Sequence, residues 1–163
     1  IVGLDIGCWY KDLCTDMAVT VPVGRVSDEI KSFLNSTKKA LLNGVAAAKV
    51  GGSIKEISKE IETVGKEDGY SIVRALVGHG VGHEVHELPH VPNFVSEQYP
   101  DEIILEGMCL ALEPMFGLGK DHSVETAADG WAIKMKDGSL GGHFEVTIAI
   151  TKEGTEILTP LPV

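Results

Sequence analysis

Residues 1–22, IVGLDIGCWYKDLCTDMAVTVP, contain two β-rich runs on either side of a polar pair at 11–12. This spacing predicts a β-hairpin with a two-residue turn. With that turn, Asp5 lies opposite Ala18, and Asp16 becomes a diagonal neighbour of Asp5 on the same face. The hairpin therefore predicts two carboxylates within reach of a common ligand.

The opposite face of the predicted hairpin is apolar, and we expect it to pack on the core. The aspartate face carries Gly3 and Gly7, which leave space between the two carboxylates. A single aspartate on an exposed sheet face is about as often only solvated as it is functional. The two aspartates therefore indicate a site only together with acidic residues on other strands. The apolar set consists of Val2, Leu4, Ile6, Cys8, Tyr10, Leu13, Met17, Val19 and Val21.

A second unusual segment, residues 78–90, reads GHGVGHEVHELPH and holds four of the six histidines. Its last five residues match the H-E-x-x-H pattern of zinc peptidases, which requires a continuous helix. Pro89 falls inside the required turn, where it removes an amide donor and costs about 3 kcal/mol or more. We therefore expect a glycine-hinged turn that presents histidines from the end of a strand.

The pattern between these two segments is helical. Ser27, followed by two acidic residues, predicts the N-cap of a helix that should end near residues 51–52. Residues 53–56 form a capping box for a second helix, which Gly69 should end. We assign both helices to packing. The apolar positions of the first helix are Ile30, Phe33, Leu34, Leu41, Leu42 and Val45.

Several strand-like runs follow, at residues 71–77, 108–113 and 143–151, with another starting at 129–131. In the run 108–113, Leu110 and Leu112 alternate with Cys109, Ala111 and Glu113. In the run 143–151, Phe144, Val146, Ile148 and Ile150 form the apolar set, and Glu145 shares the other face with His143, Thr147 and Ala149. Residues 92–102 are polar, contain two prolines, and predict a surface loop.

The composition predicts one domain, residues 1–163, because 44% of the chain is hydrophobic. A net charge of −10 argues against nucleic acid or an anionic membrane as a partner. Three cysteines without C-x-x-C spacing predict neither a disulfide framework nor a zinc–thiolate site, and they favour a reduced, cytoplasmic setting. No apolar run approaches the roughly 20 residues of a membrane span, and no signal peptide is recognisable.

Four carboxylates, those of Asp5, Asp16, Glu113 and Glu145, share one property. Each is predicted on a strand whose apolar side chains face the other way, and four acids on one sheet face would repel unless cations neutralised them. With His79 they form an oxygen-rich set with one imidazole, suited to manganese, iron(II), cobalt or zinc. Two bridging carboxylates could hold two ions roughly 3.5–4 Å apart.

Taken together, these motifs resemble a type I methionine aminopeptidase, a pita-bread metallopeptidase. The resemblance implies an α+β fold corresponding to the C-terminal portion of that domain, with a curved, mostly antiparallel sheet and helices packed on one face. The matching motifs span nearly the whole chain in the family's order. They are Leu4-Asp5-Ile6, Thr15-Asp16, Gly78-His79-Gly80-Val81-Gly82, Val85-His86-Glu87, Leu112-Glu113-Pro114-Met115, Asp129-Gly130-Trp131, Lys136-Asp137-Gly138-Ser139 and Phe144-Glu145.

The resemblance also implies a cofactor of two divalent metal ions, manganese, cobalt, iron or zinc. Asp5 would chelate one metal, Asp16 and Glu145 would bridge both, and His79 with Glu113 would complete the shell of the other.

The implied activity is removal of methionine from the N-terminus of peptides and nascent proteins. For catalysis, the resemblance implies that His86 hydrogen-bonds the substrate near the scissile peptide. It also implies that Glu113 moves the proton of the attacking water. Trp131 would line the pocket for the methionine side chain.

The sequence departs from the family's pattern at two neighbouring positions. Val146 stands where the family usually has histidine, and His143 precedes Phe144. We expect neither to contact the five ligands. Residues 83–84, His-Glu, resemble proline-specific relatives, so a proline-specific aminopeptidase or dipeptidase is an alternative. A binding module of the same fold that has lost catalysis is a second alternative.

The last departure is length. The chain opens with Ile1-Val2-Gly3-Leu4, already strand-like and without an initiator methionine, at what would be the last hairpin of the family's upstream half. We expect it to be the remainder of something longer. A sheet without that half should expose apolar surface, which favours self-association.

Overall fold

The computed structural model describes residues 1–161, which form two helices and twelve strands. In chain order these are β1 (Val2–Tyr10), β2 (Leu13–Val21), α1 (Asp28–Ala47), α2 (Ile54–Asp68), β3 (Ser71–Ile72), β4 (Gly78–Gly80), β5 (Glu87–Val91), β6 (Cys109–Leu112), β7 (Met115–Gly117), β8 (Val124–Thr126), β9 (Ile133–Met135), β10 (Gly141–His143), β11 (Val146–Thr151) and β12 (Gly154–Ile157).

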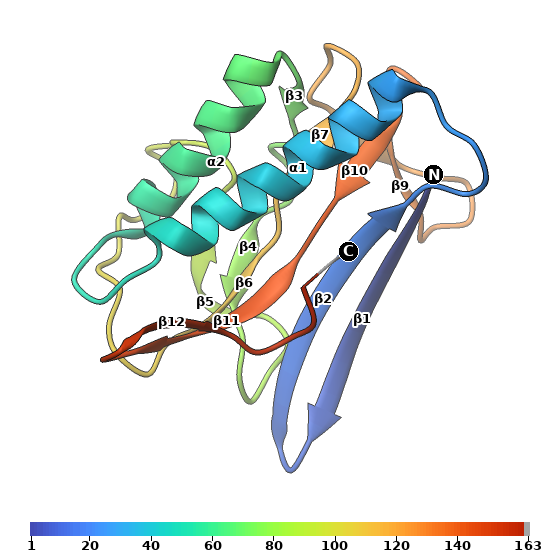
Figure 1. The fold of residues 1–163 in the computed structure, drawn as a ribbon. Helices are drawn as coiled ribbons and strands as arrows, with labels where there is room; N and C mark the ends of the chain where they lie inside the picture. The colour runs from blue at the N-terminus through green and yellow to red at the C-terminus, as the bar shows by residue number, and fades with distance from the viewer. Residues whose placement is uncertain (162–163) are drawn as a thin grey trace.

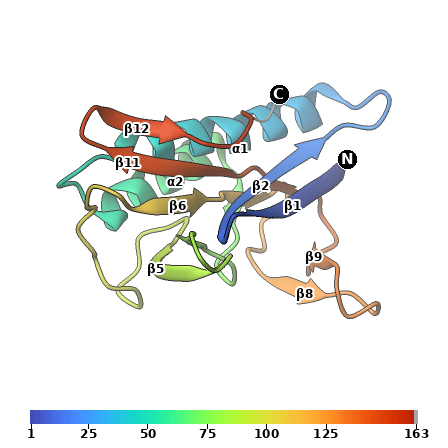
Figure 2. The same ribbon diagram turned by 90° about the horizontal axis from the view of Figure 1, so that it is seen from below.

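The strands form sheets that are antiparallel throughout the described residues. The largest has the order β12-β11-β6-β4-β5, and β10-β7-β3 form a second. Helices α1 and α2 lie side by side over one face of the strands, whereas the β1–β2 hairpin extends away from them (Figure 1). Seen from below, the hairpin lies in front of the sheet and the helices lie behind it (Figure 2). The predicted α+β arrangement, with helices on one face of a mostly antiparallel sheet, is confirmed.

Both helices begin as predicted. Ser27 caps α1 by accepting a hydrogen bond from the Ile30 N–H at 3.3 Å, and Ser53 with Glu56 forms the capping box of α2. The predicted end of α1 near 51–52 is wrong, because the helix stops at Ala47.

Helix α1 ends early because the residues that follow it pair with Ile104, in the loop that crosses the start of α2. The Gly51 N–H donates to the Ile104 carbonyl, and the Ile104 N–H donates to the Gly52 carbonyl, both at 2.9 Å. These bonds satisfy backbone groups that a longer helix would have used.

The main core lies between the helices and the sheet. Leu110 and Leu112 face it, whereas Ala111 and Cys109 pack in a separate small cluster on the other side, so the predicted alternation in β6 is confirmed. Leu42, predicted as a core position of α1, is 40% exposed. Neither helix in this part of the chain has the length and apolar composition that crossing a membrane requires.

Three predicted strands differ from the observed ones. The run 71–77 contributes only the short β3, and the strand expected to start at 129 begins at Ile133. Before it, Asp129 Oδ1 accepts hydrogen bonds from the N–H groups of Trp131 and Ala132 and holds a turn. The run 143–151 is divided into β10 and β11, which pair with different neighbours, β7 and β6.

The hairpin has the predicted register, with Asp5 opposite Ala18 and a two-residue turn at Lys11 and Asp12. Both turn residues have positive φ, 50° and 65°, as the twist of a tight hairpin requires.

The prediction that the apolar face of the hairpin packs on the core is wrong. Val2, Leu4 and Ile6 are 45%, 54% and 64% exposed, although Val19 contacts the core edge. The buried positions of β2 instead lie on the aspartate face, namely Cys14, Asp16, Ala18 and Thr20.

The aspartate face is buried because two threonine hydroxyls and one backbone bridge attach it to the strand break at 144–145. Thr147 Oγ1 donates to the Asp16 carbonyl and accepts from the Asp16 N–H, both at 2.8 Å. Thr20 Oγ1 makes the same pair of bonds to the backbone of His143, both at 2.9 Å. Between these two clamps, the Glu145 N–H donates to the Ala18 carbonyl at 2.8 Å.

Replacing Thr147 with the isosteric valine should therefore lower the free energy of unfolding by about 1–3 kcal/mol, because two buried backbone groups of Asp16 lose their partner. Chemical denaturation of the metal-free protein measures this. Thr126→Val on the exposed strand β8 is the control and should change stability by less than about 0.5 kcal/mol. Equal effects from the two substitutions would contradict the role of the clamp.

Candidate metal centre

The five predicted ligands come together from five separate segments of the fold. Asp5 lies on β1, Asp16 on β2, His79 on β4, Glu113 directly after β6, and Glu145 between β10 and β11. Ligand atoms of Asp5, Asp16 and Glu145 lie within 4.8 Å of one another, and so do those of His79, Glu113 and Glu145. Glu145 belongs to both groups and joins them.

The backbone of β4 approaches its neighbours so closely that only glycine fits beside His79. A Cβ at Gly78 would press on the Ala111 carbonyl oxygen, and a Cβ at Gly80 would press on that of Leu88. The close approach of the neighbouring strands leaves His79 only 5% exposed. The predicted glycine-hinged turn is wrong for His79, which lies within strand β4, and the glycines beside it instead permit the close approach of neighbouring strands.

The imidazole of His79 is oriented by its own backbone. Its Nδ1 lies 2.9 Å from the Gly80 carbonyl oxygen. Because a carbonyl oxygen only accepts, Nδ1 carries the proton, and the lone pair of Nε2 faces Glu113 Oε1 at 3.5 Å. A hydrogen bond of this kind fixes the tautomer of histidines that bind metals.

His86 lies at the exposed rim of the site. Its ring packs edge-on against that of His79 with 4.3 Å between centroids, and one ligand atom each of Asp16, His79 and His86 lie within 4.8 Å of one another. Residues 87–91 that follow are strand β5, so the H-E-x-x-H spelling is not helical, as predicted.

Glu113 has a polar neighbour in three directions. The Asn93 side-chain amide donates to its carbonyl oxygen at 3.1 Å, and His79 lies at its Oε1. His143 Nε2 lies 3.3 Å from its Oε2. The expectation that His143 contacts none of the five residues is therefore wrong. The alternation of residues 143–151, which places His143 and Glu145 on one face, was the signal for this contact.

The electrostatics of the cluster are dominated by Glu145, which is 2% exposed. Burial, followed by repulsion from Glu113, Asp16 and Asp5, raises its pKa to about 10. Burial and then Asp5 also raise the pKa of Asp16. Among residues 1–161, no ion pair joins these carboxylates to lysine or arginine.

One buried atom tests whether the site suits a metal ion. Glu145 Oε1 is shielded from solvent and has no hydrogen-bond partner. A buried carboxylate oxygen without a partner is strongly unfavourable unless a cation neutralises it. Carboxylate oxygens with one imidazole are ligands that divalent transition metals accept. The donor set therefore fits divalent metal ions.

A cavity of about 1140 Å³ opens beside this cluster. Its walls combine polar groups of the site with apolar side chains from β7, β9 and the segment after β3. Trp131, predicted to line a substrate pocket, borders the cavity and is 88% exposed. The other lining residues include Asp5, His79, His86, Glu113, His143, Val73, Leu76, Met115, Phe116, Met135 and Leu140.

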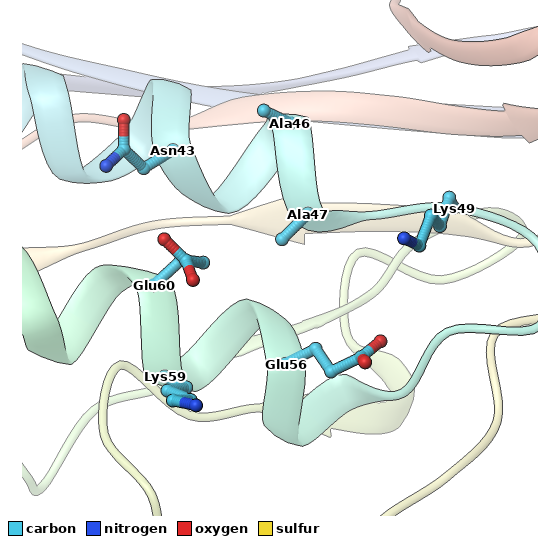
Figure 3. A pocket seen from close by; sticks show the side chains of 7 residues that line it. All are labelled: Asn43, Ala46, Ala47, Lys49, Glu56, Lys59 and Glu60. Carbon is cyan, nitrogen blue, oxygen red and sulfur yellow. The ribbon is translucent and has the colours of Figure 1, made fainter.

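A second groove lies between α1 and α2 (Figure 3). It is lined by small and charged side chains, Asn43, Ala46, Ala47, Lys49, Glu56, Lys59 and Glu60. None of the five candidate ligands borders it.

Residues 1–152 match the sequence profile of metallopeptidase family M24, and the chain belongs to this family. It is similar to the methionine aminopeptidase of Aquifex aeolicus (strain VF5), with 41% identity over 162 residues that cover 99% of this chain and 62% of that protein. The chain thus spans about 62% of the length of such curated relatives.

Solved structures agree with this assignment. The crystal structure of a methionine aminopeptidase from Thermotoga maritima has a TM-score of 0.91 and 38% identity, covering 96% of this chain and 62% of that one. An X-Pro aminopeptidase from the same organism has a TM-score of 0.75 and 26% identity, covering 97% and 39%. The predicted pita-bread fold and the resemblance to methionine aminopeptidases are confirmed.

The raised pKa of Glu145 makes the metal-free protein sensitive to pH. Between the ordinary value near 4.5 and about 10, the folded state retains a proton that the unfolded state releases. The free energy of unfolding should therefore fall as the pH rises through this window. Glu145→Gln should flatten this slope and raise the melting temperature of the metal-free protein at pH 8, each kcal/mol corresponding to about 2–4 °C.

Thermal unfolding in a chelating buffer at pH 5, 6.5 and 8 measures this slope. Glu60→Gln, on the exposed side of α2, is the control and should behave like the unsubstituted chain. The same pH dependence in the Glu145→Gln variant would show that Glu145 is not the buried, protonated carboxyl.

Proposed function

We propose that this chain is the metal-binding part of an aminopeptidase that removes methionine from the N-terminus of peptides and nascent proteins. The observation that carries the proposal is the position of Glu145, which is shared by two groups of ligands beside a cavity with an apolar wall. The 41% identity to a methionine aminopeptidase supports the choice of substrate.

In this proposal two divalent ions, manganese, cobalt, iron or zinc, are held by the five clustered residues. Asp5 would bind one ion, His79 and Glu113 would bind the other, and Asp16 and Glu145 would contribute carboxylates to both. When bound, such ions activate a water molecule and stabilise the negative charge that develops on the peptide carbonyl. The fixed tautomer of His79, whose Nε2 faces the cluster, supports its role.

The remaining chemistry falls to residues at the cavity wall. Glu113 accepts the proton of the attacking water and delivers it to the leaving amine, since its carboxylate borders both cavity and cluster. His86, exposed at the rim, donates a hydrogen bond to the substrate near the scissile peptide. Met115, Met135 and Trp131 line the wall that receives the methionine side chain.

The setting follows from the substrate. N-termini of nascent proteins are presented in the cytoplasm, where the free thiols of Cys8, Cys14 and Cys109 remain reduced. We therefore place the protein in the cytoplasm, with no nucleic-acid or membrane partner.

A proline-specific peptidase with the same ligands is the alternative within the family. Its support is the likeness to the X-Pro aminopeptidase, at 26% identity and a TM-score of 0.75. The higher values for methionine aminopeptidases, 38% and 0.91, favour methionine. A non-catalytic binding module is less well supported, because all five ligand positions are occupied by suitable residues.

The metal-loaded chain should release methionine from Met-Ala-Ser faster than it cleaves an Xaa-Pro peptide. Glu113→Gln should lower kcat by about 10²–10⁴, the range for loss of a general acid–base group. Chromatographic quantitation of free methionine measures both effects, and Glu60→Gln on α2 serves as a carboxylate control with unchanged rates. Preference for the Xaa-Pro peptide would replace the proposal with the alternative.

The exposed apolar face of the hairpin should cause self-association. Val2, Leu4 and Ile6 lie together on β1 with about half of each side chain exposed, and contiguous apolar surface of this kind favours association. Light scattering should give a mass above one chain, and Ile6→Lys should reduce it. Leu158→Lys, at another exposed apolar position, should not. A monodisperse monomer of the unsubstituted chain would contradict this prediction.

A further inference from the structure

Besides His86, the imidazole of His143 lies against the cluster, beside the carboxylate of Glu113. His143 ends β10, and its side chain is 24% exposed. The Nε2 atom itself is fully buried, lies 3.3 Å from Glu113 Oε2, and makes no hydrogen bond of good geometry. Buried polar atoms without a hydrogen-bond partner are rare, so the position of this atom beside a carboxylate calls for an explanation.

The backbone of His143 is fixed on both sides. Thr20 Oγ1 bonds to both its N–H and its carbonyl group, and the residue pairs with Met115 of β7. Met115 follows Glu113 by two positions, so the pairing brings the imidazole to the side of the Glu113 carboxylate. The ring is therefore placed by the sheet and not by chance contact of a surface side chain.

The imidazoles of His79 and His143 each lie beside a different oxygen of the Glu113 carboxylate. His79 Nε2, whose lone pair is free because Nδ1 carries the proton, faces Oε1 at 3.5 Å. Two lone pairs repel, so His79 cannot hold that oxygen itself. His143 Nε2 lies 3.3 Å from the other oxygen, Oε2, and can donate a hydrogen to it.

We propose that His143 is a positioning residue whose Nε2–H holds Oε2 of Glu113, so that Oε1 stays directed at the site where His79 and Glu145 would bind a cation. This inference rests on the proposed function, because it concerns a ligand of that metal site. Partners that orient ligating side chains in this way change metal affinity by about 10–100-fold when they are removed.

The test compares two substitutions in the full chain. His143→Leu fills the space without a donor, whereas His143→Gln keeps an N–H donor at similar reach. Calorimetric titration with cobalt(II) chloride should show about 10–100-fold weaker binding for the leucine variant with the same number of ions bound. The glutamine variant should bind within about threefold of the unsubstituted chain. The visible spectrum of bound cobalt(II) should change in the leucine variant only, and circular dichroism checks that each variant is folded.

Three results would overturn the proposal. Unchanged affinity in the leucine variant would mean that His143 does not hold Glu113. Loss of one bound ion would make His143 itself a ligand. A glutamine variant as weak as the leucine variant would mean that donation of a hydrogen is not what matters.

A metal-free measurement separates this inference from the proposed function. If the unsubstituted chain bound no cobalt, the proposed function would fail, but the tautomer of His143 would still test the contact. Nitrogen-15 NMR of the metal-free protein should find the proton on Nε2, with that preference lost in Glu113→Gln. A proton on Nδ1 in the unsubstituted chain would refute the contact whether or not metal binds.

Discussion

The burial of Glu145 among other carboxylates is the constraint on which the rest of this structure depends. Its Oε1 has no partner, its pKa is raised to about 10, and no lysine or arginine of residues 1–161 forms an ion pair with the cluster. Such a cluster is unfavourable in the metal-free fold and becomes favourable with divalent cations. The cluster therefore lowers the stability of the metal-free protein, and a bound cation would offset this cost.

The architecture separates the parts that provide stability from the parts that bind. The apolar core lies between the helices and the sheet, on the side away from the hairpin. The hairpin is attached on its polar face, where the hydroxyls of Thr147 and Thr20 flank the Glu145 bridge. Because hydrogen bonds are directional, this attachment fixes the positions of Asp16 and His143 more narrowly than apolar packing would. The consequence is an apolar outer face left exposed on β1.

Local chemistry predicted much of this structure. The two-residue turn set the register that brings Asp5 and Asp16 together, the caps at Ser27 and Ser53 began the helices, and alternation placed Glu145 on a polar face. Three features depended on contacts distant in sequence. The buried face of the hairpin, the early end of α1 and the break at 144–145 each follow from pairing with a remote segment. The contact of His143 with Glu113 was visible in the alternation, but it required the pairing of β10 with β7.

Proton release on metal binding tests the central claim most directly. At pH 7 a carboxyl with a pKa of about 10 carries a proton, which must leave when Glu145 binds a cation. Calorimetric titration with manganese(II) in buffers of different ionisation enthalpy counts the protons released per chain. We expect saturable binding with about one proton or more released, and less release from Glu145→Gln. Binding without proton release, or no saturable binding, would contradict it.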